Sequence, residues 1–117
     1  MGRLSTHVLD TARGKPAAGV RITLYRLDGA ARQVVAETVT NADGRSDRPL
    51  LADAALTAGV YELEFQAGDY LRSSGQAGAG TLFLDVIPIR FGVPDASQHY
   101  HVPLLISPFG YSTYRGS

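Results

Sequence analysis

The sequence predicts one all-β domain over residues 1–117, an antiparallel β-sandwich. Two observations support this prediction. Short runs in which apolar and polar residues alternate, the period of a half-buried strand, outnumber segments with helical periodicity. Clusters of Gly, Pro, Asn and Asp separate these runs, as turns do in sandwiches. Seven or eight short strands separated in this way are typical of two packed sheets.

The first half of the chain is expected to form three strands. A strand-like alternation begins almost at the N-terminus, over residues 4–9. Residues 19–27 alternate between apolar and polar side chains, which favours a strand with one buried face. Residues 33–40 are rich in β-branched side chains, which favour strands, and they end at the Asn-Ala-Asp-Gly turn of residues 41–44.

The second half is expected to form four more strands. Residues 60–67 and 98–106 again alternate between apolar and polar side chains. Residues 86–92 form a third strand, which is placed at a sheet edge or a bulge because Pro88 has no backbone N–H to donate. The last strand is the C-terminal tail, residues 111–117.

One short helix is expected between these strands. It begins near Asp69, whose carboxylate suits the N-cap position, and runs through Ser73. Residues 74–80 are rich in Gly, Ala and Ser, so they are expected to end the helix and form a loop. Neither an internal repeat nor a linker divides the chain, which predicts a single domain.

Composition argues against several classes of protein. The chain has no cysteine, which leaves neither disulfides nor thiolate metal sites. Its formal net charge is zero, with 11 basic and 11 acidic residues, so no basic nucleic-acid-binding surface is expected. No apolar run approaches the ~20 residues of a membrane span, and no signal peptide is evident. We therefore expect a soluble cytoplasmic protein with neither nucleic-acid nor membrane partners.

Three histidines and several arginines are the main residues able to carry chemistry. His99 and His101 lie two apart on a predicted strand and therefore point to the same face. Two ligands fall short of the three that a catalytic zinc keeps, so we expect no metal site. His7 lies within the first strand. Arg45 follows a glycine turn and could bind planar polar groups through its guanidinium fork, with Arg48 as a nearby rival.

The C-terminal tail keeps a strand-like alternation to its last residue. Within residues 111–117, Arg115 is expected on one face and Tyr114 and Gly116 on the other. Ordering a chain end costs about 1–2 kcal/mol of backbone entropy per residue. An ordered, polar end therefore indicates either packing or a functional role.

Three motifs are similar to those of one known family. The first is Leu-Ser-Thr-His-Val-Leu-Asp-Thr at residues 4–11, followed by Gly-Lys-Pro-Ala at residues 14–17. The second is Thr-Asn-Ala-Asp-Gly-Arg at residues 40–45. The third is His-Tyr-His-Val-Pro-Leu-Leu at residues 99–105 with Tyr-Ser-Thr-Tyr-Arg-Gly-Ser at residues 111–117. Together they resemble the 5-hydroxyisourate hydrolase branch of the transthyretin-like family. Hormone-carrying transthyretins share that fold but lack the terminal tetrapeptide.

The resemblance implies a transthyretin-like sandwich of two four-stranded sheets with one short helix. It implies a homotetramer, a dimer of dimers, that takes a small-molecule substrate. The implied reaction is hydrolysis of 5-hydroxyisourate, a cyclic amide, to 2-oxo-4-hydroxy-4-carboxy-5-ureidoimidazoline in urate degradation, with neither a metal nor an organic cofactor. The implied catalytic residues are His7, Arg45, His101 and Ser117. The implied substrate-binding residues are His7, Arg45, Tyr114, Arg115, Gly116 and Ser117.

Some questions stay open from the sequence. Either His7 or His101 could take the proton from water, and His99 is given no role. Leu84-Asp85 stands where family members carry Phe-Pro, which affects the expected geometry of that loop. Two other functions are possible: a transthyretin-type module that binds a small ligand without turnover, and a purely structural β-sandwich domain.

Overall fold

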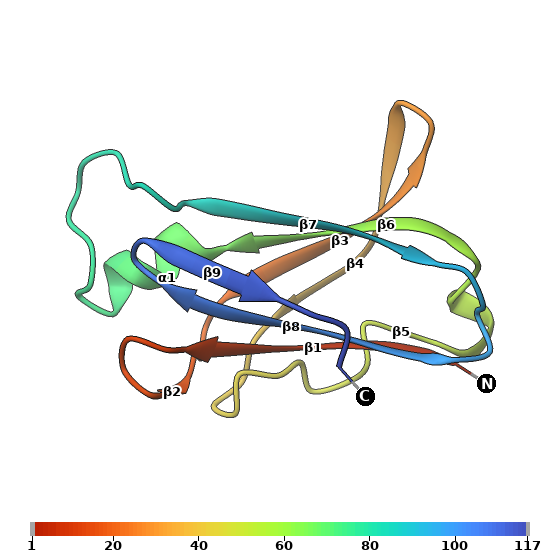
Figure 1. Ribbon diagram of the computed structural model, residues 1–117, viewed down its shortest axis with the longest axis horizontal. Coiled ribbons are helices and arrows are strands. Elements are labelled where there is room, and N and C mark those ends of the chain that lie inside the picture. The colour runs from red at the N-terminus through yellow and green to blue at the C-terminus, as the bar shows by residue number, and fades with distance from the viewer. Residues whose placement is uncertain (1, 117) are drawn as a thin grey trace.

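The computed structural model describes residues 2–116 as a sandwich of two β-sheets (Figure 1). Its elements in chain order are β1 (Arg3–Asp10), β2 (Lys15–Pro16), β3 (Arg21–Asp28), β4 (Ala31–Val39), β5 (Leu51–Ala52), the 3-10 helix η1 (Asp53–Ala55), β6 (Gly59–Gln66), α1 (Ala67–Ser73), β7 (Val86–Val93), β8 (His99–Ser107) and β9 (Gly110–Thr113). One sheet has the order β2-β1-β8-β9, with β5 also paired to β1, and the other has the order β4-β3-β6-β7. The predicted all-β sandwich with one short α-helix is confirmed.

The sheets differ from the prediction in two ways. β1 and β8 pair in parallel, so the sandwich is not wholly antiparallel. The first sheet has five strands rather than four because β2 and β5, each of two residues, both pair with β1. Two residues are too few to show an alternation, which explains why periodicity did not reveal these strands. The edge position expected from Pro88 is confirmed, because β7 lies at the edge of the second sheet.

The expected N-cap of the helix is wrong. α1 begins at Ala67, and Asp69 lies within its first turn, where its carboxylate pairs with Arg72 at 3.7 Å. The N-cap residue is Gln66, whose side chain makes no capping bond. The N–H of Gly68 instead donates to the carbonyl of Asp85 at 3.0 Å, so the following loop satisfies this end of the helix.

No helix within residues 2–116 is long and apolar enough to cross a bilayer.

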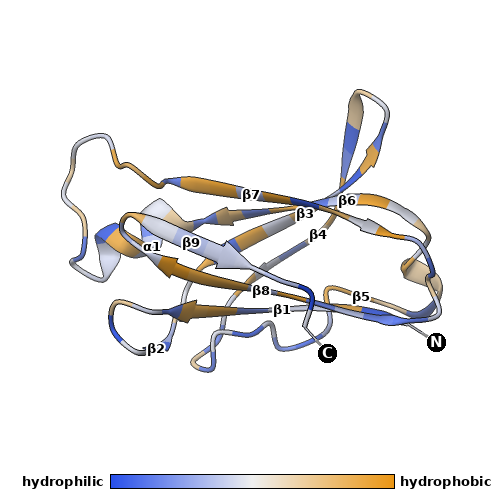
Figure 2. Ribbon diagram, viewed as in Figure 1, coloured by the Kyte–Doolittle hydropathy of each residue, from blue (hydrophilic) through white to orange (hydrophobic). Residues whose placement is uncertain are grey.

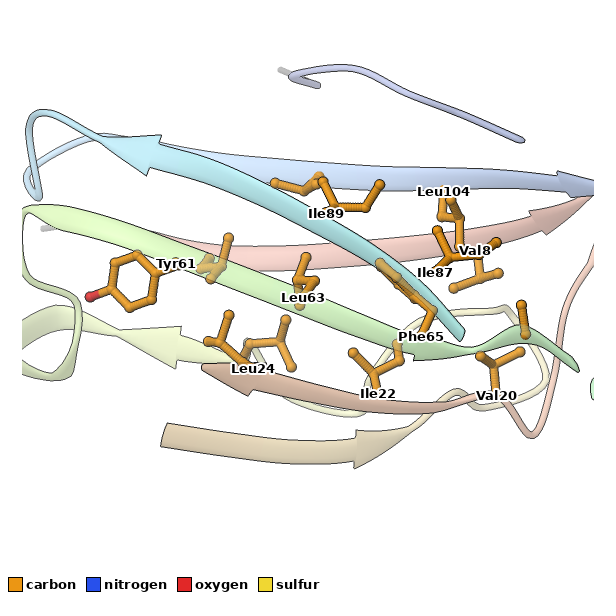
Figure 3. Packing of buried hydrophobic residues seen from close by; sticks show 14 of the residues in the cluster. Val8, Val20, Ile22, Leu24, Tyr61, Leu63, Phe65, Ile87, Ile89 and Leu104 are labelled. Carbon is orange, nitrogen blue, oxygen red and sulfur yellow. The ribbon is translucent and has the colours of Figure 1, made fainter. Parts of the chain in front are cut away.

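The hydrophobic core fills the space between the two sheets. Val8 and Leu104 of the first sheet face Leu63 and Ile87 of the second (Figure 3), and all four are at most 1% exposed. Because alternate residues of a strand face opposite sides, the same packing turns the intervening polar residues of β1 and β8 outward. Figure 2 shows that these two strands are hydrophobic toward their C-terminal ends and more polar toward their N-terminal ends. The polar half of this outer face is the part that carries the candidate site.

A buried carboxylate ties the end of β1 to the helix and its loop. Asp10 is 1% exposed and accepts hydrogen bonds from the Tyr70 hydroxyl at 2.6 Å, the Gln76 amide at 2.8 Å and the Arg13 N–H at 3.0 Å. Burial alone would raise the pKa of Asp10, but the hydrogen bonds and the Arg13 charge outweigh burial and lower this pKa. The ionised carboxylate is therefore the form that stabilises the fold.

Asp10→Asn is expected to lower the free energy of unfolding at neutral pH by about 1–3 kcal/mol, because it leaves buried donors without their charged acceptor. The pKa of Asp10 is lowered in the folded state. Its stabilising effect is therefore present above the unfolded value of about 3.9 and is lost as the pH falls through the folded value. Urea unfolding between pH 7 and pH 3 should show the wild type and the variant converging in acid.

The matched control is Asp69→Asn, which changes an acid whose side chain is 66% exposed. It should change stability by at most about 0.5 kcal/mol at any pH. A difference between wild type and Asp10→Asn that did not change with pH would contradict the account of Asp10.

Candidate functional site

Three polar side chains of β1 and β8 gather on the outer face of the first sheet. The parallel register places Ser5 directly opposite His101. The neighbouring residues Thr6 and Val102 are buried between the sheets. Because side chains alternate along a strand, Ser5, His7 and His101 all face outward, as the predicted alternation of residues 4–9 requires.

The turn of residues 41–45 carries Arg45 to this face. Asn41 organises the turn, because its side-chain oxygen accepts the N–H of Asp43 at 2.9 Å and the N–H of Arg45 at 3.2 Å. The N–H of Asn41 in turn donates to the carbonyl of Arg45 at 2.8 Å. The position of Arg45 is therefore set by a compact turn, although its side chain is exposed.

Gly44 allows this turn to lie against β1. Its φ of 77° lies in the left-handed region, and a Cβ at this position would collide with the carbonyl of Val8. The carbonyl of Gly44 accepts the N–H of Val8 at 2.8 Å, and Arg45 forms a β-bridge with His7. The turn and the strand therefore present Arg45 and His7 side by side.

His7 has a fixed tautomer. Its Nε2 lies 2.8 Å from the carbonyl oxygen of Asp43. A carbonyl can only accept, so Nε2 carries the hydrogen and donates it. In neutral His7 the lone pair is therefore on Nδ1.

His101 is held in its neutral form. Burial lowers the pKa of His101 below the usual 6.5, and the charges of Arg45 and His7 lower it further. Nδ1 of His101 lies 2.9 Å from Oγ of Ser5. A neutral imidazole beside a guanidinium can accept a proton and can also be close to a developing negative charge.

The C-terminal tail passes beside His101. β9 ends at Thr113, so the predicted strand is wrong for residues 114–116. The N–H of Gly116 then donates to the carbonyl of His101 at 2.7 Å and forms a β-bridge with it. A Cβ on Gly116 would lie only 2.5 Å from Cδ2 of His101, so only glycine lets the chain pass here without a shift. Figure 1 shows the tail leaving β9 beside β8. Ser117 lies outside the described residues.

We use the term histidine groove for the hollow on this face. Its volume is about 460 Å³, which suits a small molecule. Its lining residues are Arg3, Ser5, Arg45, His99, Tyr100 and His101. Within residues 2–116, no group of three or more His, Asp or Glu side chains is arranged to hold a metal ion.

Tyr114 and Arg115 do not line the histidine groove of the single chain. They line a neighbouring hollow of about 240 Å³ that also includes residues of β7. The guanidinium of Arg115 lies 4.5 Å from the centre of the Tyr100 ring and donates to the Gln98 side-chain oxygen and to the His99 carbonyl, both at 3.1 Å. These contacts anchor the tail across the start of β8.

Ser5 and Asn41 are site residues that the sequence reasoning did not single out. For Ser5 a signal is present, because the alternation of residues 4–9 places it on the same face as His7. For Asn41 the signal is its place at the start of a turn, where its short side chain can bind the backbone N–H groups that follow.

Arg45→Gln is expected to raise the pKa of His101, because it removes a positive charge that lowers this pKa. The measurement is an NMR titration of the His101 imidazole in both proteins. Arg48→Gln is the matched control on the same loop and should leave the pKa of His101 nearly unchanged. Equal shifts in the two variants would contradict the placement of Arg45 beside His101.

Sequence comparisons relate the whole chain to one family. The model described as "HIUase/Transthyretin family" matches residues 4–116. The 5-hydroxyisourate hydrolase of Mesorhizobium japonicum is 66% identical over 116 residues, which cover 99% of this chain and 93% of the relative. The 5-hydroxyisourate hydrolase 2 of Rhizobium meliloti is 59% identical over 116 residues, covering 99% of this chain and 97% of the relative.

Solved structures of related proteins are also similar to this chain. The structure of Klebsiella pneumoniae 5-hydroxyisourate hydrolase has a TM-score of 0.82 at 39% identity and is matched over the full length of both chains, 100% of each. A crystal structure of (S)-allantoin synthase has a TM-score of 0.93 at 49% identity, and the match covers 99% of this chain and 44% of that chain. Sea bream transthyretin in complex with thyroxine has a TM-score of 0.86 at 30% identity, covering 97% and 94% of the two chains.

Proposed function

Because the chain belongs to the HIUase/Transthyretin family, we propose that it hydrolyses 5-hydroxyisourate to 2-oxo-4-hydroxy-4-carboxy-5-ureidoimidazoline. The observation that carries the proposal is the grouping of His7, Arg45 and His101 on one outer face. Such a grouping supplies a base, a cation and a second titratable group to a planar, polar amide substrate. Relatives that match nearly the whole chain at 59–66% identity carry the name of this hydrolase.

His101 is proposed as the general base. Burial and the neighbouring charges lower its pKa, so its imidazole is unprotonated at neutral pH. It takes a proton from water as the water oxygen attacks the amide carbonyl carbon. The His101 imidazole then gives the proton to the amide nitrogen of the substrate as the carbon–nitrogen bond breaks. The six-membered ring of the substrate opens in this step. His101 lines the histidine groove and His7 does not, so His101 is the better placed of the two histidines for this role.

Arg45 is proposed to bind the substrate and stabilise its charge. When water adds to the carbonyl, negative charge develops on the carbonyl oxygen, and a fixed guanidinium stabilises this charge. Its fork of N–H donors can also bind acceptor oxygens at the edge of a planar ring. The Asn41 turn holds the Arg45 backbone in place, which fixes where its side chain begins beside His7. Neither step requires a metal or an organic cofactor.

The tail is proposed to complete the site. Gly116 already lies against the His101 ring, which supports this role. We propose that Tyr114, Arg115, Gly116 and Ser117 contact the substrate. Tyr114 and Arg115 would reach the substrate if the groove were closed by a further copy of the chain.

We propose that the chain forms a homotetramer, a dimer of dimers, in which a further copy closes the groove. β7 and β9 are each an edge strand of one sheet, and unpaired strand edges favour association with another copy. Exposed aromatic side chains such as Phe83 and Phe109, 73% and 78% exposed, add apolar surface for contact. Light scattering should then give four times the 12.5 kDa mass of the chain. A cytoplasmic location stays a prediction.

The experiment that tests the function is the decay of fresh 5-hydroxyisourate, made from urate with uricase. The protein should accelerate the loss of its ultraviolet absorbance in proportion to protein concentration. An unchanged decay would contradict the hydrolase proposal. The transthyretin-type alternative predicts instead saturable binding of thyroxine by the protein, with no effect on the decay.

A further inference from the structure

We propose that Ser5 is a positioning residue that holds His101 in the Nδ1–H tautomer, so that Nε2 presents its lone pair to the attacking water. This inference rests on the proposed hydrolase function. It assigns a role to a side chain that lies beside the reacting groups without being one of them.

The contact between the two side chains is fixed by the sheet. Ser5 and His101 are register partners on adjacent strands, and Ser5 Oγ lies 2.9 Å from Nδ1. The inward neighbours Leu4 and Val102 are buried, which fixes how each strand is rotated. The carbonyl of His101 accepts the N–H of Gly116, so the backbone behind the ring is also held. The buried neighbours on β1 and β8 therefore fix the positions of Ser5 and His101. Their hydrogen bond does not depend on a loop.

The direction of this hydrogen bond decides whether His101 can act as a base. A hydroxyl can donate or accept, and a neutral imidazole has one N–H and one lone pair. If Ser5 donated to Nδ1, the ring hydrogen would be on Nε2 and the only lone pair would be occupied. If Nδ1–H donates to Ser5, Nε2 has a free lone pair. The second arrangement is the one in which neutral His101 keeps this hydrogen bond and can still take a proton.

The same arrangement survives the reaction. When Nε2 takes the proton from water, both ring nitrogens carry hydrogen, and Ser5 Oγ continues to accept from Nδ1. A hydroxyl that donated to Nδ1 would have to rotate away at that moment. His101 would then hold the opposite tautomer to His7, whose Nε2–H is fixed by the Asp43 carbonyl.

The test combines NMR and kinetics on the full chain. A two-bond ¹H–¹⁵N spectrum, recorded at a pH where His101 is neutral, reports which ring nitrogen is protonated. The wild type should show the Nδ1–H pattern for His101, and Ser5→Ala should shift it toward Nε2–H. Because the rate scales with the fraction of the competent tautomer, kcat should fall about tenfold while KM stays within about twofold. Ser5→Thr, which keeps the hydroxyl, should retain both the tautomer and most of kcat.

Each result supports or overturns the proposal. An Nε2–H pattern in the wild type would overturn it, as would a Ser5→Ala variant whose tautomer or kcat is unchanged, or a Ser5→Thr variant no better than Ser5→Ala. Ser73→Ala, at the end of α1, is the control and should alter neither quantity. If Ser5→Ala does not fold, the wild-type spectrum alone decides. If the wild type has no turnover, the proposed function fails, but the tautomer can still be read from the spectrum.

Discussion

His101→Gln is expected to lower kcat/KM for 5-hydroxyisourate by about 10²–10⁴-fold, the usual contribution of a general acid–base group. Glutamine keeps a polar side chain of similar reach but cannot take a proton from water. In the wild type, kcat/KM should fall at acidic pH as His101 becomes protonated. Because burial, Arg45 and His7 lower the pKa of His101, the midpoint of this fall should lie below the usual 6.5 of histidine. The measurement is the initial rate of decay at substrate concentrations below KM, from pH 5 to pH 8.

The matched control for this prediction is His99→Gln. His99 lies two residues earlier on β8 and faces the same side, but its side chain is exposed. Its replacement should lower kcat/KM by at most a few fold. Equal losses in the two variants, or an acid limb that persists unchanged in His101→Gln, would show that His101 is not the base.

Gly116→Ala is expected to reduce kcat by about 10²-fold, the cost of a displacement of about 1 Å near the reacting groups. The added methyl group would lie 2.5 Å from Cδ2 of His101, so either the ring or the tail must move. Since the contact involves the chain end, the sandwich itself should keep its thermal stability within about 0.5 kcal/mol. The decay assay and a thermal unfolding curve, run on the same preparation, measure both effects.

Gly80→Ala is the corresponding control. A Cβ on Gly80 meets no atom within 4 Å, so the same substitution adds a methyl group in open space. It should leave kcat and stability unchanged. Full activity in Gly116→Ala would mean that the tail lies beside the site without shaping it.

The strands that sequence reasoning recovered are those with a local signal. β1, β3, β6, β7 and β8 lie within about two residues of their predicted bounds because alternation of apolar and polar side chains is visible in the strand itself. β4 does so as well, because its β-branched side chains and the turn that follows it are visible in the sequence. β2 and β5 have no such signal, since they exist only through pairing with β1. The parallel pairing of β1 with β8 joins opposite ends of the chain, and no local pattern contains this information.

In the candidate site too, local features were visible in the sequence and long-range contacts were not. The residue types and their faces were readable, because alternation placed Ser5 and His7 together and a glycine turn preceded Arg45. The distances between them were not readable. The contact of Ser5 with His101 spans 96 positions, and it depends on a register that forms only when the sandwich folds. The close passage of Gly116 over the His101 ring has the same origin.

The central claim is that this outer face hydrolyses 5-hydroxyisourate through His7, Arg45 and His101 acting together. The most direct test compares the decay of the substrate with wild-type protein and with the triple variant His7→Ala/Arg45→Ala/His101→Ala. Residues that act as one unit are not additive, so the triple variant should be little slower than the worst single variant. The account predicts acceleration proportional to wild-type concentration, with the folded triple variant close to the uncatalysed decay. A triple variant that still turned over substrate at a rate near that of the wild type would contradict it.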